Sequence, residues 1–88
     1  ILETYAGTYD SRQFPPFHIR FQDSQLEIRS ADGKLWNPLY AETETRFFVK
    51  RKQAFRFEFI RDESDHATAL RLEIQGLQLP AAPKVEMR

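Results

Sequence analysis

The sequence has 88 residues, 13 of them basic and 13 acidic, so its formal net charge is +0, and it contains no cysteine. This length corresponds to one domain, and a balanced charge provides no long-range field to attract phosphates or anionic lipid, which argues against nucleic acid and membrane surfaces as partners. The lack of cysteine excludes disulfides and thiolate metal sites, and no apolar run approaches the ~18 residues of a membrane-spanning helix. Because the first residue is Ile1, we expect the sequence to be a segment of a longer chain.

Alternation of apolar and polar residues dominates the sequence, whereas helical periodicity is nearly absent. Each alternating run has one apolar and one polar face, which is typical of antiparallel strands with one face buried and the other in solvent. In chain order, the predicted strands lie at 5–10, 17–22, 26–29, 35–41, 46–50, 54–61, 67–75 and 84–87. About eight strands at regular spacing predict an antiparallel all-β domain, either a sandwich or a barrel.

A first hairpin is predicted across residues 17–29. Its favoured register buries two apolar pairs: Phe21 with Leu26 and Ile19 with Ile28. Arg20 then lies opposite Glu27 on the polar face, and an opposite-charge pair of this kind contributes roughly 0.2–1 kcal/mol. The register leaves Asp23 and Ser24 as a two-residue turn.

The charges select the register of a second hairpin, which spans residues 54–75. In the predicted register three apolar pairs face the core: Phe59 with Leu70, Phe57 with Leu72, and Phe55 with Ile74. Glu58 then lies opposite Arg71, and Arg56 lies opposite Glu73, on the outer face. A two-residue slip would bring like charges together, and a one-residue slip would turn the whole apolar set outward.

The strand predicted at 46–50 should pair with the Phe-rich strand of that hairpin. Three cross-strand pairs follow from this arrangement: Phe47 with Phe57, Val49 with Phe55, and Arg46 with Glu58. Phe48 then falls on the outer face beside Arg56, where a guanidinium above its ring would explain its exposure locally. Ile60 falls on the same face. Phe48 and Ile60 are therefore our candidate interaction residues, on the condition that they form a patch with their neighbours.

Residues able to carry out catalysis are few and do not occur in a known motif. The serines are at positions 11, 24, 30 and 64 and the histidines at 18 and 66, and none lies in a Gly-x-Ser-x-Gly or Ser-x-x-Lys element. Ser64 precedes His66 by two positions in a predicted loop. Formation of a turn explains the presence of both residues there without a catalytic role. We therefore expect no catalytic residue and no enzymatic activity.

The acidic segment 62–66 is the best candidate for a metal site, but a solvated hairpin tip explains it better. It lacks the glycine and the distal glutamate that are usual in calcium loops, and two histidines without a third ligand are weak support for zinc. His18 is interpreted as a surface imidazole. Because Gly7, Gly33 and Gly76 are isolated, no glycine-rich loop could cradle a phosphate. We expect neither a metal nor another cofactor.

Two ligand-binding interpretations remain. Aromatic residues on a sheet face could stack bases or sugars, but the alternation directs most of the phenylalanines inward. A small closed barrel could instead bind an apolar ligand, although eight strands leave room for little more than their own side chains, and the eight phenylalanines would fill it. A small-molecule ligand is therefore disfavoured. As the alternative hypothesis, it predicts an empty internal cavity of roughly 300 Å³ or more.

The order of several short motifs resembles a known family. These motifs are Leu2-x-x-Tyr5-x-Gly7-x-Tyr9, Phe17-x-Ile19-x-Phe21, Asp32-Gly33-Lys34-Leu35, Phe47-Phe48, Phe57-x-Phe59 and Leu70-x-Leu72-x-Ile74-x-Gly76. They resemble the C-terminal β-domain of unknown function that follows serine β-lactamase-like and penicillin-binding-protein-like hydrolases. The resemblance covers the chain from Leu2 to about Val85 and departs at 62–66, which lacks the glycine that commonly follows the acidic turn in the family.

The resemblance implies a small antiparallel meander that forms a closed or partly open lipocalin-like barrel. It also implies a bacterial accessory domain that packs beside a catalytic domain. Such domains are often exported, so a periplasmic or secreted location is expected. The resemblance assigns no catalytic residue to this chain. We therefore expect residues 1–88 to be a single β domain from the C-terminal end of a longer chain. Its expected function is that of a non-catalytic accessory or interaction domain of a larger, hydrolase-like protein, and its expected partner is the catalytic domain upstream.

Overall fold

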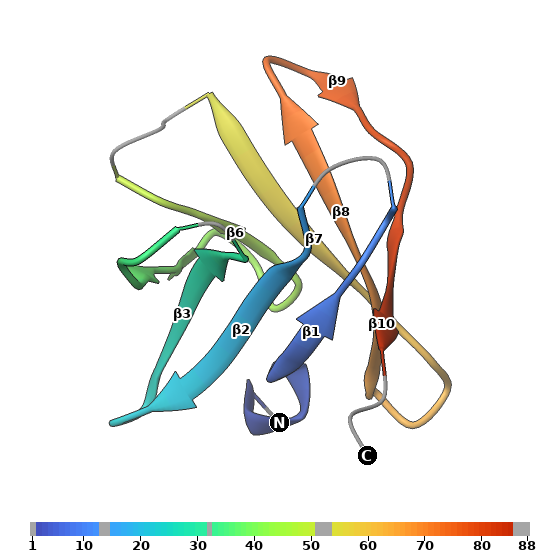
Figure 1. Ribbon diagram of the computed structural model, residues 1–88. Coiled ribbons are helices and arrows are strands. Elements are labelled where there is room, and N and C mark those ends of the chain that lie inside the picture. The colour runs from blue at the N-terminus through green and yellow to red at the C-terminus, as the bar shows by residue number, and fades with distance from the viewer. Residues whose placement is uncertain (1, 13–14, 32, 51–53, 86–88) are drawn as a thin grey trace.

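The alternating segments form strands, and the protein is all-β, as predicted (Figure 1). The computed structural model describes residues 2–12, 15–31, 33–50 and 54–85. The elements are the 3₁₀ helix η1 (Leu2–Tyr5) and the strands β1 (Gly7–Tyr9), β2 (Phe17–Gln22), β3 (Gln25–Ser30), β4 (Asn37–Pro38), β5 (Tyr40–Ala41), β6 (Arg46–Phe48), β7 (Phe55–Arg61), β8 (Ala67–Ile74), β9 (Leu77–Gln78) and β10 (Ala82–Val85). The strand pairs formed by these residues are antiparallel.

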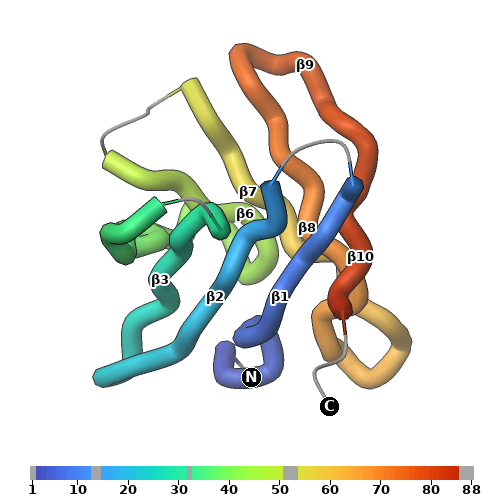
Figure 2. Tube along the Cα trace, in the orientation of Figure 1, coloured from blue at the N-terminus to red at the C-terminus, as the bar shows by residue number. Residues whose placement is uncertain are grey.

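The strands form a nearly closed barrel, which confirms the predicted fold class. Their order in the sheet is β4-β3-β2-β1-β10-β8-β7-β6-β5, and β9 also pairs with β8. The strands at the two ends of this order, β4 and β5, are neighbours in the chain and flank Leu39, whose amide donates a 2.8 Å hydrogen bond to the carbonyl of Leu26. Residues 37–41 therefore bridge the two edges of the sheet, pairing first with β3 and then with β6 (Figure 2).

The predicted registers of both hairpins and the pairing of Phe47 with Phe57 are confirmed, whereas the predicted pair of Val49 with Phe55 is not observed, because β6 ends at Phe48. The apolar pairs are Phe21 with Leu26, Ile19 with Ile28, Phe55 with Ile74, Phe57 with Leu72, Phe59 with Leu70, and Phe47 with Phe57. Arg46 lies opposite Glu58, as expected. Asp23 and Ser24 form the turn of the first hairpin with φ angles of 53° and 62°, and positive φ at both positions is what a type I′ hairpin turn requires.

Several predicted strand boundaries are wrong, and one lies partly outside the described residues. The strand predicted at 46–50 ends at Phe48, and the one predicted at 5–10 ends at Tyr9. The strand expected to begin at position 35 begins at Asn37, and Leu39 divides it into β4 and β5, because the chain changes partner there. Tyr5, expected to begin a strand, belongs to η1 instead. The last strand was predicted at 84–87 and is observed as Ala82–Val85, whereas residues 86–87 lie outside the described part of the chain.

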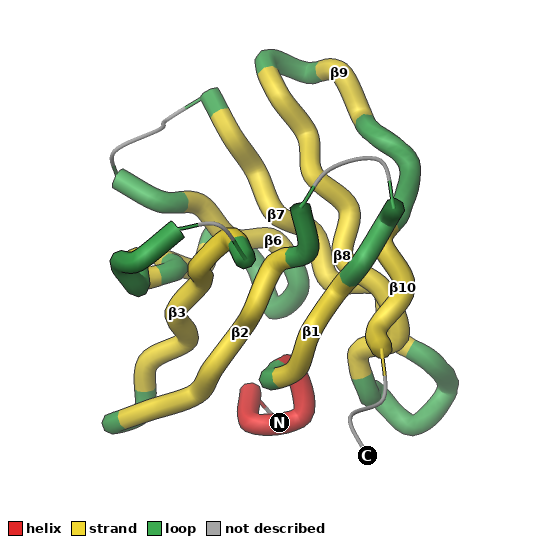
Figure 3. Tube along the Cα trace, in the orientation of Figure 1, coloured by secondary structure: helices red, strands yellow, loops and turns green. Residues whose placement is uncertain are grey.

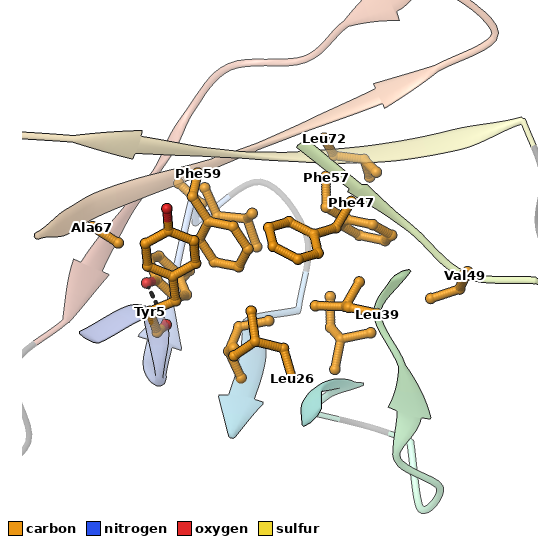
Figure 4. Close-up of a cluster of buried hydrophobic side chains, with 14 residues drawn as sticks. Tyr5, Leu26, Leu39, Phe47, Val49, Phe57, Phe59, Ala67 and Leu72 are labelled. Carbon is orange, nitrogen blue, oxygen red and sulfur yellow. Dashed lines mark hydrogen bonds between the residues drawn. The ribbon is translucent and has the colours of Figure 1, made fainter. Parts of the chain in front are cut away.

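Phe47, Phe57 and Phe59 are buried in the core, as predicted, whereas Phe17, Phe21 and Phe55 are only partly buried and pack against it. Phe47 and Phe59 lie at its centre with ring centroids 5.6 Å apart and planes at 84°, an edge-to-face arrangement that aromatic pairs favour. Leu26 and Leu39 approach these rings from the opposite wall (Figure 4). Among the described residues, the fully buried side chains are all apolar or tyrosine, so burial of apolar area is the main favourable term that holds the barrel together.

One end of the barrel is closed by η1, which lies near the N-terminus at the bottom of Figure 3. Its Tyr5 side chain is fully buried and stacks on Phe59 with ring centroids 4.5 Å apart. The Tyr5 hydroxyl donates a 2.9 Å hydrogen bond to the carbonyl of Glu44, and the Tyr9 hydroxyl donates a 2.7 Å bond to the carbonyl of Tyr5. Tyr5 is therefore a plug.

The opposite end of the barrel has no comparable plug among the described residues. At this end β2 and β7 begin while β3 and β8 end; the start of β7 and the end of β8 are at the top of Figure 1. Phe17 lies opposite Ser30, and Phe55 lies opposite Ile74. The three apolar side chains of these pairs pack against the core but are only partly buried. Among the described residues the two ends of the barrel therefore differ, and we call the end without a plug the open end.

Candidate functional site

Arg46 is the centre of a charged network on the outer face of β6, β7 and β8. Its guanidinium lies 2.7 Å from the carboxylate of Glu73, 3.1 Å from that of Glu42 and 3.5 Å from that of Glu58. Arg71 extends the network, 3.9 Å from Glu58, so the predicted row of Arg46, Glu58 and Arg71 is present. The hydrogen bond from Arg46 holds the pKa of Glu73 below its usual value, and the same bond raises the pKa of Arg46.

An aromatic pair lies beside this network, on β5 and β6. Tyr40 and Phe48 are opposite each other, with ring centroids 5.8 Å apart. The guanidinium carbon of Arg56 lies 5.3 Å from the centre of the Phe48 ring, which confirms the predicted neighbour, and its Nε lies 3.0 Å from Glu42. We call Tyr40, Phe48 and Arg56 the aromatic–arginine surface. Aromatic residues and arginine are the types enriched in protein–protein interfaces.

Ile60, the second predicted interaction residue, lies farther along β7, opposite Ala69. It is partly buried and on the outer face, as expected. Glu58 lies between Arg56 and Ile60 on this face and carries the ion pairs with Arg46. The structure therefore separates Ile60 from Phe48 by charged groups, and the two do not form one continuous apolar patch. Their role in docking stays a prediction.

The candidate catalytic and metal-binding residues are on separate parts of the surface. His18 is on β2, and its Nδ1 lies 3.0 Å from the hydroxyl of Thr8. His66 is in the loop between β7 and β8, where the Asp62 carboxylate accepts hydrogen bonds of 2.8 and 3.0 Å from the backbone amides of Ser64 and His66. These bonds, the one from His66 first, hold the pKa of Asp62 below its usual value. The acidic segment is therefore a hairpin loop organised by Asp62, as the sequence indicated.

Nothing in the described residues brings three histidine, aspartate or glutamate side chains together in a way that could hold a metal ion. The same residues contain no helix with the length and apolar character needed to cross a membrane.

A cavity of about 180 Å³ lies at the open end of the barrel. Its apolar lining consists of Phe17, Ile28, Val49, Phe55 and Phe57. Ser30 and Asn37 contribute polar groups to the lining. We call this space the mouth cavity. In Figure 4 Val49 lies at one extremity of the buried cluster and Tyr5 near the other, so the cavity and the Tyr5 plug are at opposite ends of the core.

A second cavity, of about 240 Å³, lies beside the bridging segment and is lined by Asn37, Pro38, Tyr40, Val49 and Lys50. We call it the seam cavity. Asn37 and Val49 contribute to the lining of both cavities. The Lys50 ammonium lies 4.8 Å from the centre of the Tyr40 ring, which places a positive charge at the seam cavity.

These cavities bear on the apolar-ligand hypothesis, which predicted an empty interior of roughly 300 Å³ or more. The interior between Tyr5 and Phe57 is instead filled by aromatic and aliphatic side chains, and the mouth cavity is smaller than that range. Val49 is in the core, as predicted, and Phe55 packs against the core but is only partly buried. That both residues also border the mouth cavity was not predicted. The one sequence feature that indicated this position is that both residues lie at strand ends, next to the connection between β6 and β7.

A protein-family model described as "Domain of unknown function (DUF3471)" matches residues 1–86. No curated protein and no solved structure matches the chain.

Proposed function

We propose that this chain, which belongs to that family of domains, serves as a non-catalytic accessory domain of a larger protein and docks through its aromatic–arginine surface. The supporting observation is the position of Phe48. It lies on the outer face of the barrel between Tyr40 and Arg56, at contacts of 5.8 and 5.3 Å. Rings and guanidinium groups held in this way are pre-organised for a partner, because little side-chain freedom is left to lose on binding.

The arrangement of the chemistry-bearing residues agrees with this proposal. His18 and His66 belong to different elements, and each has a local structural role, in the contact with Thr8 and in the loop organised by Asp62. The charged network beside the aromatic–arginine surface would supply a polar rim, and rim charges set orientation and association rate more than affinity.

The partner that we propose is a catalytic domain of the same polypeptide, of the serine β-lactamase-like or penicillin-binding-protein-like class, in a periplasmic or secreted protein. The sequence motifs that resemble accessory domains of such hydrolases support this choice. An intramolecular partner also suits a small surface, since linkage through the chain raises the effective concentration and allows weak contacts to hold.

Comparing the natural full-length polypeptide with the 88-residue chain tests the proposal. Amide hydrogen exchange should show extra protection of β5, β6 and β7 in the full-length protein. The variant Phe48→Ser should remove this protection and weaken docking of the separated domains about fivefold or more, as expected for truncation of an interface anchor. Ile60→Ser should have a smaller effect, because Ile60 lies beyond Glu58.

Leu77→Ser is the control, because Leu77 is an apolar residue exposed at the surface, 67% accessible, and lies on β9 and not on β5, β6 or β7. Thermal unfolding of each variant should show that the isolated domain still folds. Unchanged protection and docking in Phe48→Ser would contradict the proposal, as would a loss of docking in Leu77→Ser alone. A natural gene that encodes no further domain would contradict it as well.

A further inference from the structure

We infer that Gln25, on β3, is a positioning residue for Tyr40 of the aromatic–arginine surface and acts through the bridging segment, residues 37–41. Tyr40 belongs to this segment, which pairs first with β3 and then with β6. The inference deepens the proposed docking function and rests on it for the effect on docking. The positioning itself is a property of the 88-residue chain alone.

Gln25 anchors the bridging segment to β3 through its side-chain amide. Its Nε2 donates a 2.7 Å hydrogen bond to the carbonyl of Leu39 and a 2.9 Å bond to the carbonyl of Leu26. The backbone amide of Leu39 donates to the same Leu26 carbonyl at 2.8 Å. Both partners of the Gln25 side chain are carbonyl groups, which only accept hydrogen bonds, so its nitrogen must face them. Gln25 therefore holds Leu39, the residue that precedes Tyr40.

The backbone ladders of the bridging segment are short. β4 pairs with β3 through Asn37 and Pro38, and proline has no N–H group to donate to a ladder. On the other edge, β5 pairs with β6 through two residues, with Tyr40 opposite Phe48. An isolated two-stranded pairing is marginally stable at best. The position of the segment therefore depends on contacts beyond its ladders, and the Gln25 side chain supplies two hydrogen bonds at the point where the pairing with β3 ends.

Packing fixes the inner side of the bridging segment but leaves space beside it. The Leu39 side chain is 2% exposed and lies in the core with Leu26 (Figure 4). Gln25, Leu39 and Tyr40 also border a cavity of about 200 Å³, whose lining includes residues of β3, β5 and β6. Side chains do not fill this space. Loss of the Gln25 hydrogen bonds therefore removes a donor from the Leu39 carbonyl next to a space into which the segment can move.

A movement of the bridging segment would alter the docking surface because Tyr40 contributes one of its two rings. The centroids of Tyr40 and Phe48 are 5.8 Å apart, within the range of about 4.5–7 Å that aromatic pairs favour. Ordering a side chain on binding opposes association, and a surface that is already ordered avoids this cost. Without the Gln25 anchor, docking would have to order Tyr40, so affinity would fall although Gln25 lies outside the surface.

The variant Gln25→Met tests the positioning in the isotope-labelled 88-residue chain, because methionine has a similar length and no donor. Amide hydrogen exchange should show the protection of Leu39 falling about tenfold, as expected for the loss of ordinary hydrogen bonds. Nuclear Overhauser contacts between the rings of Tyr40 and Phe48 should weaken. The amides of β7 and β8 should keep their protection, which distinguishes local release of the segment from general destabilisation.

Two further variants separate the donor from other effects of substitution. Gln25→Lys keeps a donor at the end of a long side chain and should restore part of the Leu39 protection and of the ring contacts. Gln22→Met is the matched control, because Gln22 lies opposite Gln25 in the same hairpin and its side chain is exposed. It should leave both readouts unchanged.

Docking of the separated domains of the natural polypeptide tests the consequence. Gln25→Met should weaken docking about threefold, within the range expected for ordering one side chain, and Gln22→Met should leave it unchanged. The loss should be smaller than for Phe48→Ser, because Tyr40 is released and not removed.

Equal Leu39 protection in Gln25→Met and Gln22→Met would overturn the inference, as would reduced protection with unchanged contacts between Tyr40 and Phe48. Unchanged docking in Gln25→Met would also overturn it if docking does depend on Phe48. Docking that is insensitive to Phe48→Ser would contradict the proposed function instead. In that case the ring contacts in the 88-residue chain would still decide whether Gln25 positions Tyr40, so the two failures are distinguishable.

Discussion

Removing the Tyr5 plug should destabilise the barrel more than its N-terminal position suggests. The Tyr5 ring is fully buried, stacks on Phe59 at 4.5 Å and meets the edge of Phe47 at 6.2 Å. Its hydroxyl donates to the carbonyl of Glu44, and burial raises the pKa of the Tyr5 hydroxyl, so the group stays protonated and able to donate at neutral pH. Tyr5→Ala removes the ring and the hydrogen bond, whereas Tyr5→Phe removes the bond alone.

The expected magnitudes follow from these contacts. Tyr5→Phe should cost about 1 kcal/mol, the net value of a typical hydrogen bond. Tyr5→Ala should cost about 3–5 kcal/mol, as for other buried aromatic residues truncated to alanine. A domain of this size loses about 4–8 °C in Tm per kcal/mol. The two variants should therefore differ in Tm by at least about 8 °C.

Urea unfolding followed by circular dichroism measures both changes, with thermal unfolding as a second readout. Tyr40→Ala is the matched control, because Tyr40 is a partly exposed tyrosine on the outer face, and truncation there should cost clearly less than at Tyr5. If Tyr5→Ala proves no more destabilising than Tyr40→Ala, then the Tyr5 ring does not close the barrel and the reasoning is refuted.

Two further predictions concern a turn and an ion pair. Ser24 has a φ of 62°, and a left-handed conformation costs a non-glycine residue roughly 1–2 kcal/mol. Part of the gain from glycine is offset by its greater flexibility in the unfolded chain, so Ser24→Gly should stabilise the domain by about 0.5–1 kcal/mol in urea unfolding. A loss of stability would contradict the turn geometry. The hydrogen bond from Arg46 lowers the pKa of Glu73 in the folded state. The ionised Glu73 side chain therefore stabilises the fold at pH values above the ordinary glutamate pKa of about 4.3. This stabilisation is lost as the pH falls below that value and through the folded-state pKa. Glu73→Gln should therefore flatten the fall in Tm between neutral and strongly acidic pH, and an unchanged profile would show that this pair does not contribute.

The strand pairings could be predicted because two independent constraints agree on them. Side chains alternate with a period of two, so Phe55, Phe57 and Phe59 must share a face, and a slip by one residue would expose all three. The charges between them then distinguish registers that differ by two residues. Glu58 opposite Arg71 satisfies both constraints at once, and the structure has this pairing.

The ion pairs themselves were less predictable than the register. Glu73 lies opposite Arg56, as expected, but its 2.7 Å ion pair is with Arg46, a residue two strands away. Arginine side chains are long enough to reach diagonal neighbours, so backbone register does not determine which carboxylate each guanidinium contacts. The same network separates Phe48 from Ile60, a relation that alternation cannot reveal, because alternation assigns a face without identifying the neighbours on it.

The sequence by itself determined the all-β class, the pairing of the hairpins and the inward direction of the phenylalanines, because these follow from local alternation and from charges close together in the chain. Only the tertiary structure decided that Tyr5 leaves its expected strand to plug one end, that residues 37–41 bridge both edges of the sheet, and that Val49 and Phe55 border an open cavity. The physical reason is that barrel closure depends on contacts between segments far apart in sequence, such as Tyr5 with Glu44 and Leu39 with Leu26. No local pattern encodes those contacts.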